Sequence, residues 1–378
     1  MPCFFKNTFM LQLKKTSLFI LIIFFFGCDI EPDKNNTGDG FDRSSLLANL
    51  TDNIIIPAYN SFYNDLSDLE NKISEFILLT NESNLQSVSD SWLVAYKSWQ
   101  HIEMFDIGLA ETINFKAKIN IYPVDTTLIE SNILSGNYDL GNNNNFDARG
   151  FPALDYMIHG IALNSSLILA KYIDDINYKN YLLAIVEEMK LKTNLMIEDW
   201  NISRDAFIQS TENTATSSVN KLINDFIYYY EKGFRANKFG IPAGVFSNAS
   251  ILPYNVEAYF KADVSKDLAL ESFNAIKSFY LGKHFNSQEI GIGFADYLNY
   301  LYDISSSDND LDFIITNKFI EIENNINSLD DNFNYQITSN NMDMLLSYDL
   351  IQELVVTFKV DVLQAFNIAV DYIDADGD

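Results

Sequence analysis

Apolar residues recur at spacings of three to five along most of the chain. The first series contains Leu47, Leu50, Ile54, Tyr59, Phe62, Leu66, Leu69, Ile73 and Phe76. This spacing places the side chains on one face of an α-helix, whereas a strand requires alternation, and no alternating run of comparable length competes. The pattern therefore predicts an all-α protein.

Eight further periodic spans follow, separated by joints rich in Asn, Asp, Ser and Gly. They cover residues 85–107, 152–175, 178–200, 213–234, 266–282, 288–303, 311–328 and 341–371. Helices of these lengths fit up-and-down bundles. With 378 residues, 48% of them hydrophobic, the chain can bury one large core or two ordinary ones. We predict two domains that resemble four-helix bundles, residues 46–235 and 236–378.

A short internal similarity suggests that the two domains are a duplicated pair. A partial counterpart of the run from Gly150 to Met157, GFPALDYM, occurs in the run from Gly293 to Leu298, GFADYL. Each run opens or lies in a predicted helix of its own half. A chance match of this length is the alternative.

The N-terminus has the organisation of a secretory signal. Lys14 and Lys15 precede an apolar run from Ser17 to Phe26, which Gly27 and Cys28 follow. The apolar run has about half of the roughly 20 residues that a membrane-spanning helix needs, so a permanent anchor is the weaker alternative. We predict a lipoprotein signal peptide over residues 1–27.

Cys28 is the predicted lipidation site. Cys3 lies in the signal, so removal of residues 1–27 leaves Cys28 as the one cysteine and allows no disulfide within the chain. Residues 28–45 are polar and are predicted to form a tether. The expected location is the bacterial envelope, as an outer-membrane lipoprotein that is periplasmic or surface-exposed. A lone thiol without lipid is the alternative.

The chain is strongly acidic, with 52 Asp and Glu against 25 Lys and Arg and a net charge of −27. Loss of residues 1–27 removes three lysines and no acid, which makes the charge −30. Such a chain repels phosphates, so nucleic acid is excluded as a partner, whereas cations, cationic peptides and basic protein surfaces are attracted. Solubility alone is the other explanation.

Two acids share a predicted helix face with aromatic residues. At about 100° per residue, Glu103 and Asp106 fall on the same arc as Trp92, Tyr96 and Trp99. A buried unpaired carboxylate costs several kcal/mol, so both acids need a metal, another cation, a proton or hydrogen-bond donors. They are candidate ligand residues. Alternatively, both lie at a fraying helix end before Gly108.

Asp155 and His159 are also candidate ligands for a cation, because residues four apart share a helix face. A helix-capping role for Asp155 and a purely structural His159 are the simpler alternatives. Arg149, Arg235 and Lys238 are candidate charge partners of these acids, although Arg235 and Lys238 could also cap a helix end. The three histidines show no zinc-binding spacing.

Several segments, in order, make the chain resemble the imelysin family. They are Ile56-Pro57-Ala58-Tyr59, Trp92 to Trp99 with Glu103, Tyr122-Pro123-Val124-Asp125, Arg149 to Tyr156, Lys238 to Gly244 and Tyr372 to Asp378. The resemblance runs from about residue 46 to the end. It implies two helical bundles, an envelope location, a role in iron uptake and a peptidase label.

One motif departs from the family pattern. Where the family has G-x-H-x-x-E, this chain has Pro152 in place of the histidine and Asp155 in place of the glutamate. A histidine-dependent peptidase site is therefore doubtful, and no catalytic residue is assigned.

Three functions remain open. The first is a binding protein in iron or cation uptake, with a carboxylate-lined cleft between the bundles for iron or another divalent cation, or for a haem-related or peptide ligand. The second is a metallopeptidase with an atypical site. The third is an acidic scaffold for a protein partner, such as another envelope uptake protein.

Overall fold

Asparagine and aspartate side chains begin many of the helices. In the computed structural model, which describes residues 39–305 and 309–370, an oxygen of each capping side chain accepts a hydrogen bond from a backbone N–H of the first turn. The residues that cap in this way are Asp42, Asn81, Asp125, Asn164, Asp175, Asp310 and Asn332. Each such cap stabilises its helix by about 1 kcal/mol. The polar joints of the sequence are therefore helix starts.

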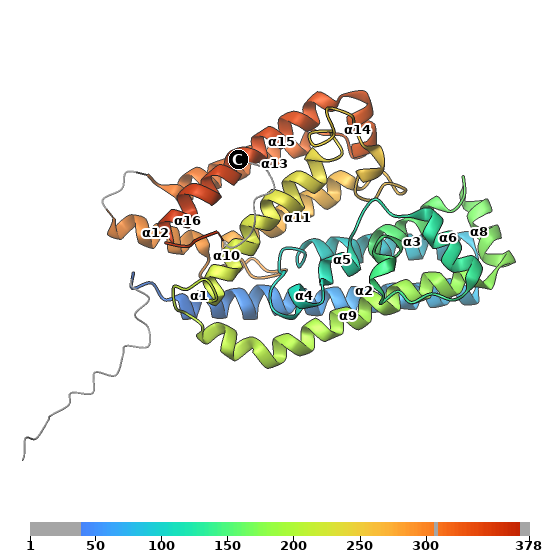
Figure 1. Cartoon of the computed structure of the whole chain (residues 1–378), viewed down its shortest axis with the longest axis horizontal. Coiled ribbons are helices and arrows are strands. Elements are labelled where there is room, and N and C mark those ends of the chain that lie inside the picture. The colour runs from blue at the N-terminus through green and yellow to red at the C-terminus, as the bar shows by residue number, and fades with distance from the viewer. Residues whose placement is uncertain (1–38, 306–308, 371–378) are drawn as a thin grey trace, which may run out of the picture. The chain divides into compact units, whose positions relative to one another are not determined.

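Three long helices organise the first half of the described chain. Helix α2 (Ile56–Leu78) packs along α3 (Glu82–Gln100) and α9 (Ile176–Gln209), and the three run side by side in blue, cyan and green in Figure 1. A π-helical segment, η1 (Thr51–Ile55), joins α1 (Arg43–Leu50) to α2. The shorter elements are α4 (Leu109–Thr112), α5 (Phe115–Ile119), α6 (Thr126–Ser135), η2 (Asn143–Ala148), α7 (Gly150–Asp155), η3 (Tyr156–Gly160) and α8 (Ser165–Asp174).

The second half is built around a helix with an unusual continuation. Helix α10 (Ser218–Tyr228) passes into the π-helical segment η4 (Tyr229–Gly240), which packs against α11 (Ser265–Tyr280) and α15 (Asn341–Val356). π-helical turns are rare in proteins, and those that occur often lie at functional sites. The other elements are η5 (Pro253–Asn255), α12 (Phe294–Ile304), α13 (Leu311–Asn327), α14 (Phe333–Ser339), η6 (Thr357–Val362) and α16 (Leu363–Ala365).

The all-α prediction is confirmed, since the described residues contain no strand and one isolated bridge between Lys283 and Ile290. The described residues all belong to one compact unit. The predicted domain boundary at residues 235 and 236 falls inside η4. The division into two domains and their duplication stay predictions.

Several predicted boundaries differ from the structure. The span 152–175 is not one helix, because it breaks between Gly160 and Ser165. The span 85–107 ends at Gln100, and the first helix starts at Arg43 rather than after Ser45. Helices α4, α5, α6 and α14 were not predicted; they have 4 to 10 residues and are too short for a clear periodicity.

Residues before Ser45 pack against the second half of the chain. Phe41 stacks on Tyr297 with ring centroids 4.2 Å apart, and the buried Arg43 donates to the Tyr297 hydroxyl and to Asp39. The end of the predicted tether is therefore packed structure. The predicted signal and Cys28 lie outside the described residues.

Within the described ranges, no single helix has the length and apolar character to cross a membrane. One bent pair, Asn143–Gly160 with Ser165–Asp174, meets that criterion by length and composition, with a bend of 105°.

Contacts between α3 and α11 join the two halves close to the site described below. Lys97 lies 3.0 Å from Asp267, and His101 Nε2 lies 2.6 Å from Glu271 Oε1. The hydrogen bond to His101 lowers the pKa of Glu271. The end of α3 is thereby fixed against α11.

Gly150 should be far less replaceable than another glycine with positive φ. It has a φ of +72°, and a Cβ there would lie 2.1 Å from the Ile119 carbonyl oxygen. A Cβ on Gly136, at φ +62°, would instead have the Asn177 side chain as its nearest neighbour, at 4.0 Å. We expect Gly136→Ala to lower the free energy of unfolding by about 1–2 kcal/mol, the cost of a left-handed alanine. Gly150→Ala should cost about 1–3 kcal/mol more, because backbone must move. Urea unfolding of both variants measures the difference, and equal losses would contradict the close approach.

Candidate functional site

A network of buried polar side chains lies where the end of α3, the segment after α5, η4 and the segment before α11 meet. We call it the polar network, and its members are Gln100, Glu103, Asn120, Tyr229, Lys238 and Glu257. All six are buried. Buried polar groups are costly unless they are hydrogen-bonded, so such a network specifies a single arrangement.

An ion pair forms one end of the polar network. Lys238 Nζ lies 2.5 Å from Glu257 Oε2 and donates to Gln100 Oε1 at 2.8 Å. The other oxygen of Glu257 accepts from Gln100 Nε2 at 3.2 Å and from Asn120 Nδ2 at 3.0 Å. The two charged side chains are 2% and 3% exposed. Each charge is therefore compensated inside the protein.

Glu103 occupies the other end. Its Oε1 accepts from Asn120 Nδ2 at 3.3 Å and lies 4.0 Å from Lys116 Nζ, and its Oε2 accepts from the Tyr229 hydroxyl at 3.0 Å. Burial, and then the charge of Glu103, raises the pKa of Tyr229 well above its usual value. The Tyr229 hydroxyl therefore remains a donor. The predicted burial of Glu103 on the aromatic face holds, although α3 ends three residues before it.

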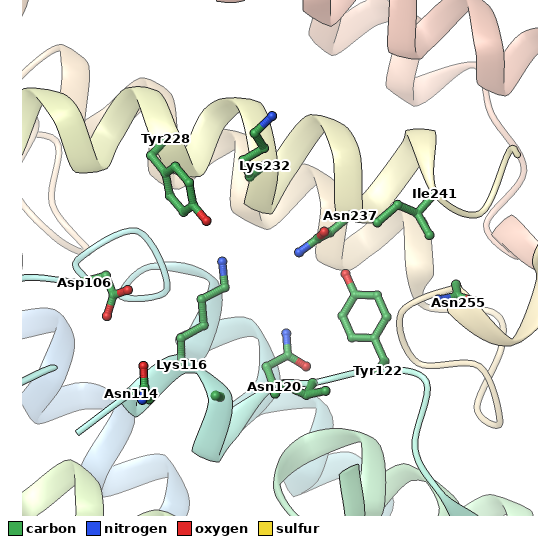
Figure 2. Close-up of a pocket in the computed structure, with 12 residues that line it drawn as sticks. Asp106, Asn114, Lys116, Asn120, Tyr122, Tyr228, Lys232, Asn237, Ile241 and Asn255 are labelled. Carbon is green, nitrogen blue, oxygen red and sulfur yellow. The ribbon is translucent and has the colours of Figure 1, made fainter. Parts of the chain in front are cut away.

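A pocket of about 380 Å³ opens beside the polar network. Figure 2 shows Lys116 and Asn120 on one wall and Tyr228 and Asn237 on the other, with the ammonium of Lys116 and the hydroxyls of Tyr122 and Tyr228 directed toward the space between them. Lys232 directs its ammonium away from Lys116, and its Nζ lies 2.9 Å from Glu231. We call this space the Lys116 pocket. Its lining offers several donors around a single inward-directed cation.

Asp106 lines the Lys116 pocket rather than the aromatic face of α3. It lies beyond the helix end, in the segment before Gly108. Burial raises the pKa of its carboxyl, and the nearby Lys116 opposes this rise. Asp106 and Glu103 thus both lie near Lys116. Asp106 lines the pocket, whereas Glu103 belongs to the buried polar network.

Asp155 and His159 lie together, as their spacing predicted. Asp155 Oδ1 lies 2.9 Å from His159 Nδ1 and accepts from the backbone N–H of Lys261 at 2.9 Å, and its Oδ2 accepts from the N–H of Phe260 at 2.8 Å. His159 Nε2 lies 2.8 Å from the Ser89 hydroxyl. Both ring nitrogens are engaged, and the contact of Nδ1 with Asp155 Oδ1 helps to position the Asp155 carboxylate.

The three predicted charge partners have different surroundings. Arg149 donates to the backbone carbonyls of Leu140 and Asn142, and Arg235 stacks on the ring of Tyr348 at 4.0 Å and donates to its hydroxyl. Lys238 pairs with Glu257. Glu257, Asn120 and Lys116 were not predicted as site residues, because none of them lies in a motif or a predicted helix.

The donor set also bears on metal binding. In the ranges 39–305 and 309–370, no group of three or more His, Cys, Asp or Glu side chains is placed to hold a metal ion. The carboxylates of Glu103, Glu257 and Asp155 instead accept hydrogen bonds from protein donors. The arrangement of these three acids fits hydrogen-bonded positions better than a resident ion.

Removal of the Lys238 ammonium should be strongly destabilising. Lys238→Met leaves Glu257 buried without its cation, which costs about 3–5 kcal/mol. The double variant Lys238→Met/Glu257→Gln should recover much of the loss. Lys97→Met, which breaks the exposed pair with Asp267, should cost under about 1 kcal/mol. Chemical denaturation measures all three, and equal losses for Lys238→Met and Lys97→Met would disprove the role of the buried pair.

Asp106→Asn should stabilise the protein at neutral pH. Because burial raises the folded-state pKa of Asp106, its ionisation opposes folding above that pKa, and the penalty vanishes as pH falls and the carboxyl is protonated. The gain in free energy of unfolding should therefore be present at pH 7 and fade toward pH 3. Thermal unfolding across this range tests it, with the exposed Asp349→Asn as control. A variant that is less stable than wild type at pH 7 would contradict the prediction.

Known proteins share this fold. A crystal structure of a putative iron-regulated protein A precursor from Parabacteroides distasonis superposes with a TM-score of 0.69 at 17% identity, covering 86% of this chain and 95% of that one. An imelysin-like protein from Psychrobacter arcticum gives 0.66 at 15%, covering 88% and 97%. At these identities the likeness concerns the fold alone.

Sequence comparison identifies the family. The chain is 24% identical to the iron-regulated protein A of Synechococcus elongatus over 82 residues, which are 22% of this chain and 23% of that protein. The match therefore spans less than a quarter of that relative. The family model described as imelysin, which also carries a peptidase name, matches residues 55–358. Since this match covers most of the chain, the protein belongs to the imelysin family.

Proposed function

We propose that this protein is a ligand-binding protein of the bacterial cell envelope that acts in iron uptake, and that it binds its ligand in the Lys116 pocket. The observation that carries the proposal is the polar network beside this pocket. Asn120 belongs to both, and Lys116 lines the pocket while it lies 4.0 Å from Glu103.

The cost of the polar network supports a functional role. A protein in which apolar side chains of similar volume replace a buried ion pair is often as stable as the original, or more stable by about 1–4 kcal/mol. A binding site, in contrast, needs side chains that a supporting shell holds in fixed positions. Glu257 and Tyr96 hold Asn120 through its amide N and O, at 3.0 and 2.6 Å. Its two N–H donors go to Glu257 and Glu103, so Asn120 fixes the shape of the pocket wall and leaves donation to a ligand to Lys116 and the other lining groups.

The lining favours an oxygen-rich, anionic ligand. The lining carries the ammonium of Lys116, amides and tyrosine hydroxyls, together with one carboxyl, that of Asp106, whose pKa is raised by burial. Such groups donate to carboxylate oxygens, and charge-assisted hydrogen bonds are the stronger ones. Iron held in a carboxylate chelate has this chemistry. The relatives named as iron-regulated proteins support the link to iron.

The sequence pattern alone predicts direct coordination of iron or another divalent cation, and this stays a prediction. Its candidate ligands are Glu103, Asp106, Asp155 and His159. It requires the carboxylates to exchange their present donors for the ion. The peptidase alternative rests on the family name and has the same requirement. Docking of a protein partner on an acidic face remains the scaffold alternative.

The proposed location is the outer membrane, with a lipid on Cys28 as the tether. Cys28 follows the apolar run Ser17–Phe26 directly after one glycine, which suits lipid attachment.

Calorimetric titration with ferric citrate tests the proposed ligand chemistry. At physiological ionic strength, which screens the diffuse negative charge, we expect saturable binding that Lys116→Gln weakens by at least about tenfold, since a hydrogen bond to a charged group contributes roughly 1.5–3 kcal/mol. Lys72→Gln, which removes an exposed lysine paired with Glu75, is the matched control and should bind as wild type does.

Two further experiments, a titration with the free metal ion and a peptide-cleavage assay, separate the alternatives. Binding of ferric citrate that Lys116→Gln leaves unchanged, or absence of binding, would contradict the Lys116 pocket as the site. Saturable binding of the free metal ion that is lost in Glu103→Gln/Asp155→Asn would support direct coordination instead. Chelator-sensitive peptide cleavage lost in the same variant would favour the peptidase.

A further inference from the structure

A second pocket, of about 400 Å³, shares Tyr122 with the Lys116 pocket but has a different chemistry. Its walls are mostly aromatic and aliphatic. We call it the aromatic pocket, and the residues that matter here are Tyr122, Asp155, Tyr156, Tyr254, Tyr259 and Phe260. Asp155 is the one Asp, Glu, Lys, Arg or His side chain of this lining.

Four of the rings form a continuous row. The ring centroids of Tyr254 and Tyr259 lie 4.8 Å apart, those of Tyr259 and Phe260 5.0 Å, and those of Phe260 and Tyr156 5.2 Å. Tyr254 is 64% exposed, whereas Tyr156 is 8% exposed. The row therefore leads from solvent into the pocket.

Asp155 fixes the backbone that carries this row. Ala258 and Ala262 flank Tyr259 and Phe260 with φ angles of +57° and +69°, a conformation that alanine rarely adopts. The two hydrogen bonds from Phe260 and Lys261 to Asp155 hold the segment between them. Strained backbone that its surroundings hold in place is frequent at ligand sites. The aromatic wall is thus built before any ligand arrives.

Charge defines what the aromatic pocket attracts. The face of an aromatic ring is electron-rich and attracts cations, by about 0.5–2 kcal/mol per contact. The Tyr156 hydroxyl donates to Glu130 at 2.8 Å, which makes its ring richer in electrons, and Asp155 adds a carboxylate. The chain as a whole has a net charge of −27. All three contributions favour positive charge.

We propose that the aromatic pocket binds an organic cation, either a small quaternary amine, whose charge is spread over alkyl groups, or the basic side chain of a peptide. A bare metal ion suits it poorly, because Asp155 is the one carboxylate of the lining and its oxygens already accept hydrogen bonds from the protein. This site is independent of the function proposed for the Lys116 pocket. It also gives Asp155, at the position of the family's glutamate, the role of a positioning residue.

Binding of choline and of its uncharged carbon analogue 3,3-dimethyl-1-butanol, followed by NMR titration of the purified protein, tests the proposal. The two probes have the same shape, so only charge distinguishes them. We expect choline to bind about tenfold more tightly, in line with one or two cation–aromatic contacts. N-acetyl-lysine methylamide, titrated in parallel, represents the peptide source. Tight binding of either cation supports the proposal and identifies the source.

Substitutions at Tyr259 separate ring electrostatics from simple apolar contact. Tyr259→Phe keeps the ring and should bind within about twofold of wild type, whereas Tyr259→Leu keeps apolar volume and should lose about tenfold. Tyr335→Leu, at an exposed tyrosine of α14, is the matched control, and Lys116→Gln should leave choline binding unchanged. Equal affinity for choline and its neutral analogue, no binding of either cation, or full binding by Tyr259→Leu would overturn the proposal.

Discussion

Lys238 and Glu257 form an ion pair that is almost completely removed from water, and the arrangement of the neighbouring site depends on it. Lys238 donates to Gln100, and Glu257 accepts from both Gln100 and Asn120. These hydrogen bonds hold the two amides in one orientation. Asn120 in turn reaches Glu103. A side chain in the pocket wall is thereby coupled to a charge pair contributed by η4 and the segment before α11.

The π-helical segment η4 explains how so much charge can be buried on one element. Glu231, Arg235 and Lys238 all lie on η4, and all are at most 5% exposed. Each is matched by a group from another part of the chain or from a neighbouring residue, such as Lys359 for Glu231 and Tyr348 for Arg235. A helix with these residues is stable only when the partners are already in place, so local sequence does not determine its structure.

The position of the family motif has a physical role even though its histidine is absent. Asp155 is held by His159 and accepts two backbone hydrogen bonds from the turn that carries Tyr259 and Phe260. Its carboxylate therefore supports a wall of the aromatic pocket. The Lys116 pocket and the aromatic pocket meet at Tyr122, so a single tyrosine separates a region rich in donors from one rich in ring faces.

The sequence by itself determined the helical class and the burial of its aromatic faces, because spacings of three to four report directly on a helix face. The spacing of Asp155 and His159 likewise predicted their contact, since both lie in one local segment. Tertiary structure alone decided the partners of the charges. Glu257 lies 19 residues from Lys238 and 137 from Asn120, and no periodicity relates residues so far apart. It also decided that Asp106 faces a pocket, because the helix that would have kept it beside Trp99 ends at Gln100. Local patterns fix which face is buried, whereas the partner of a buried charge depends on how distant segments pack.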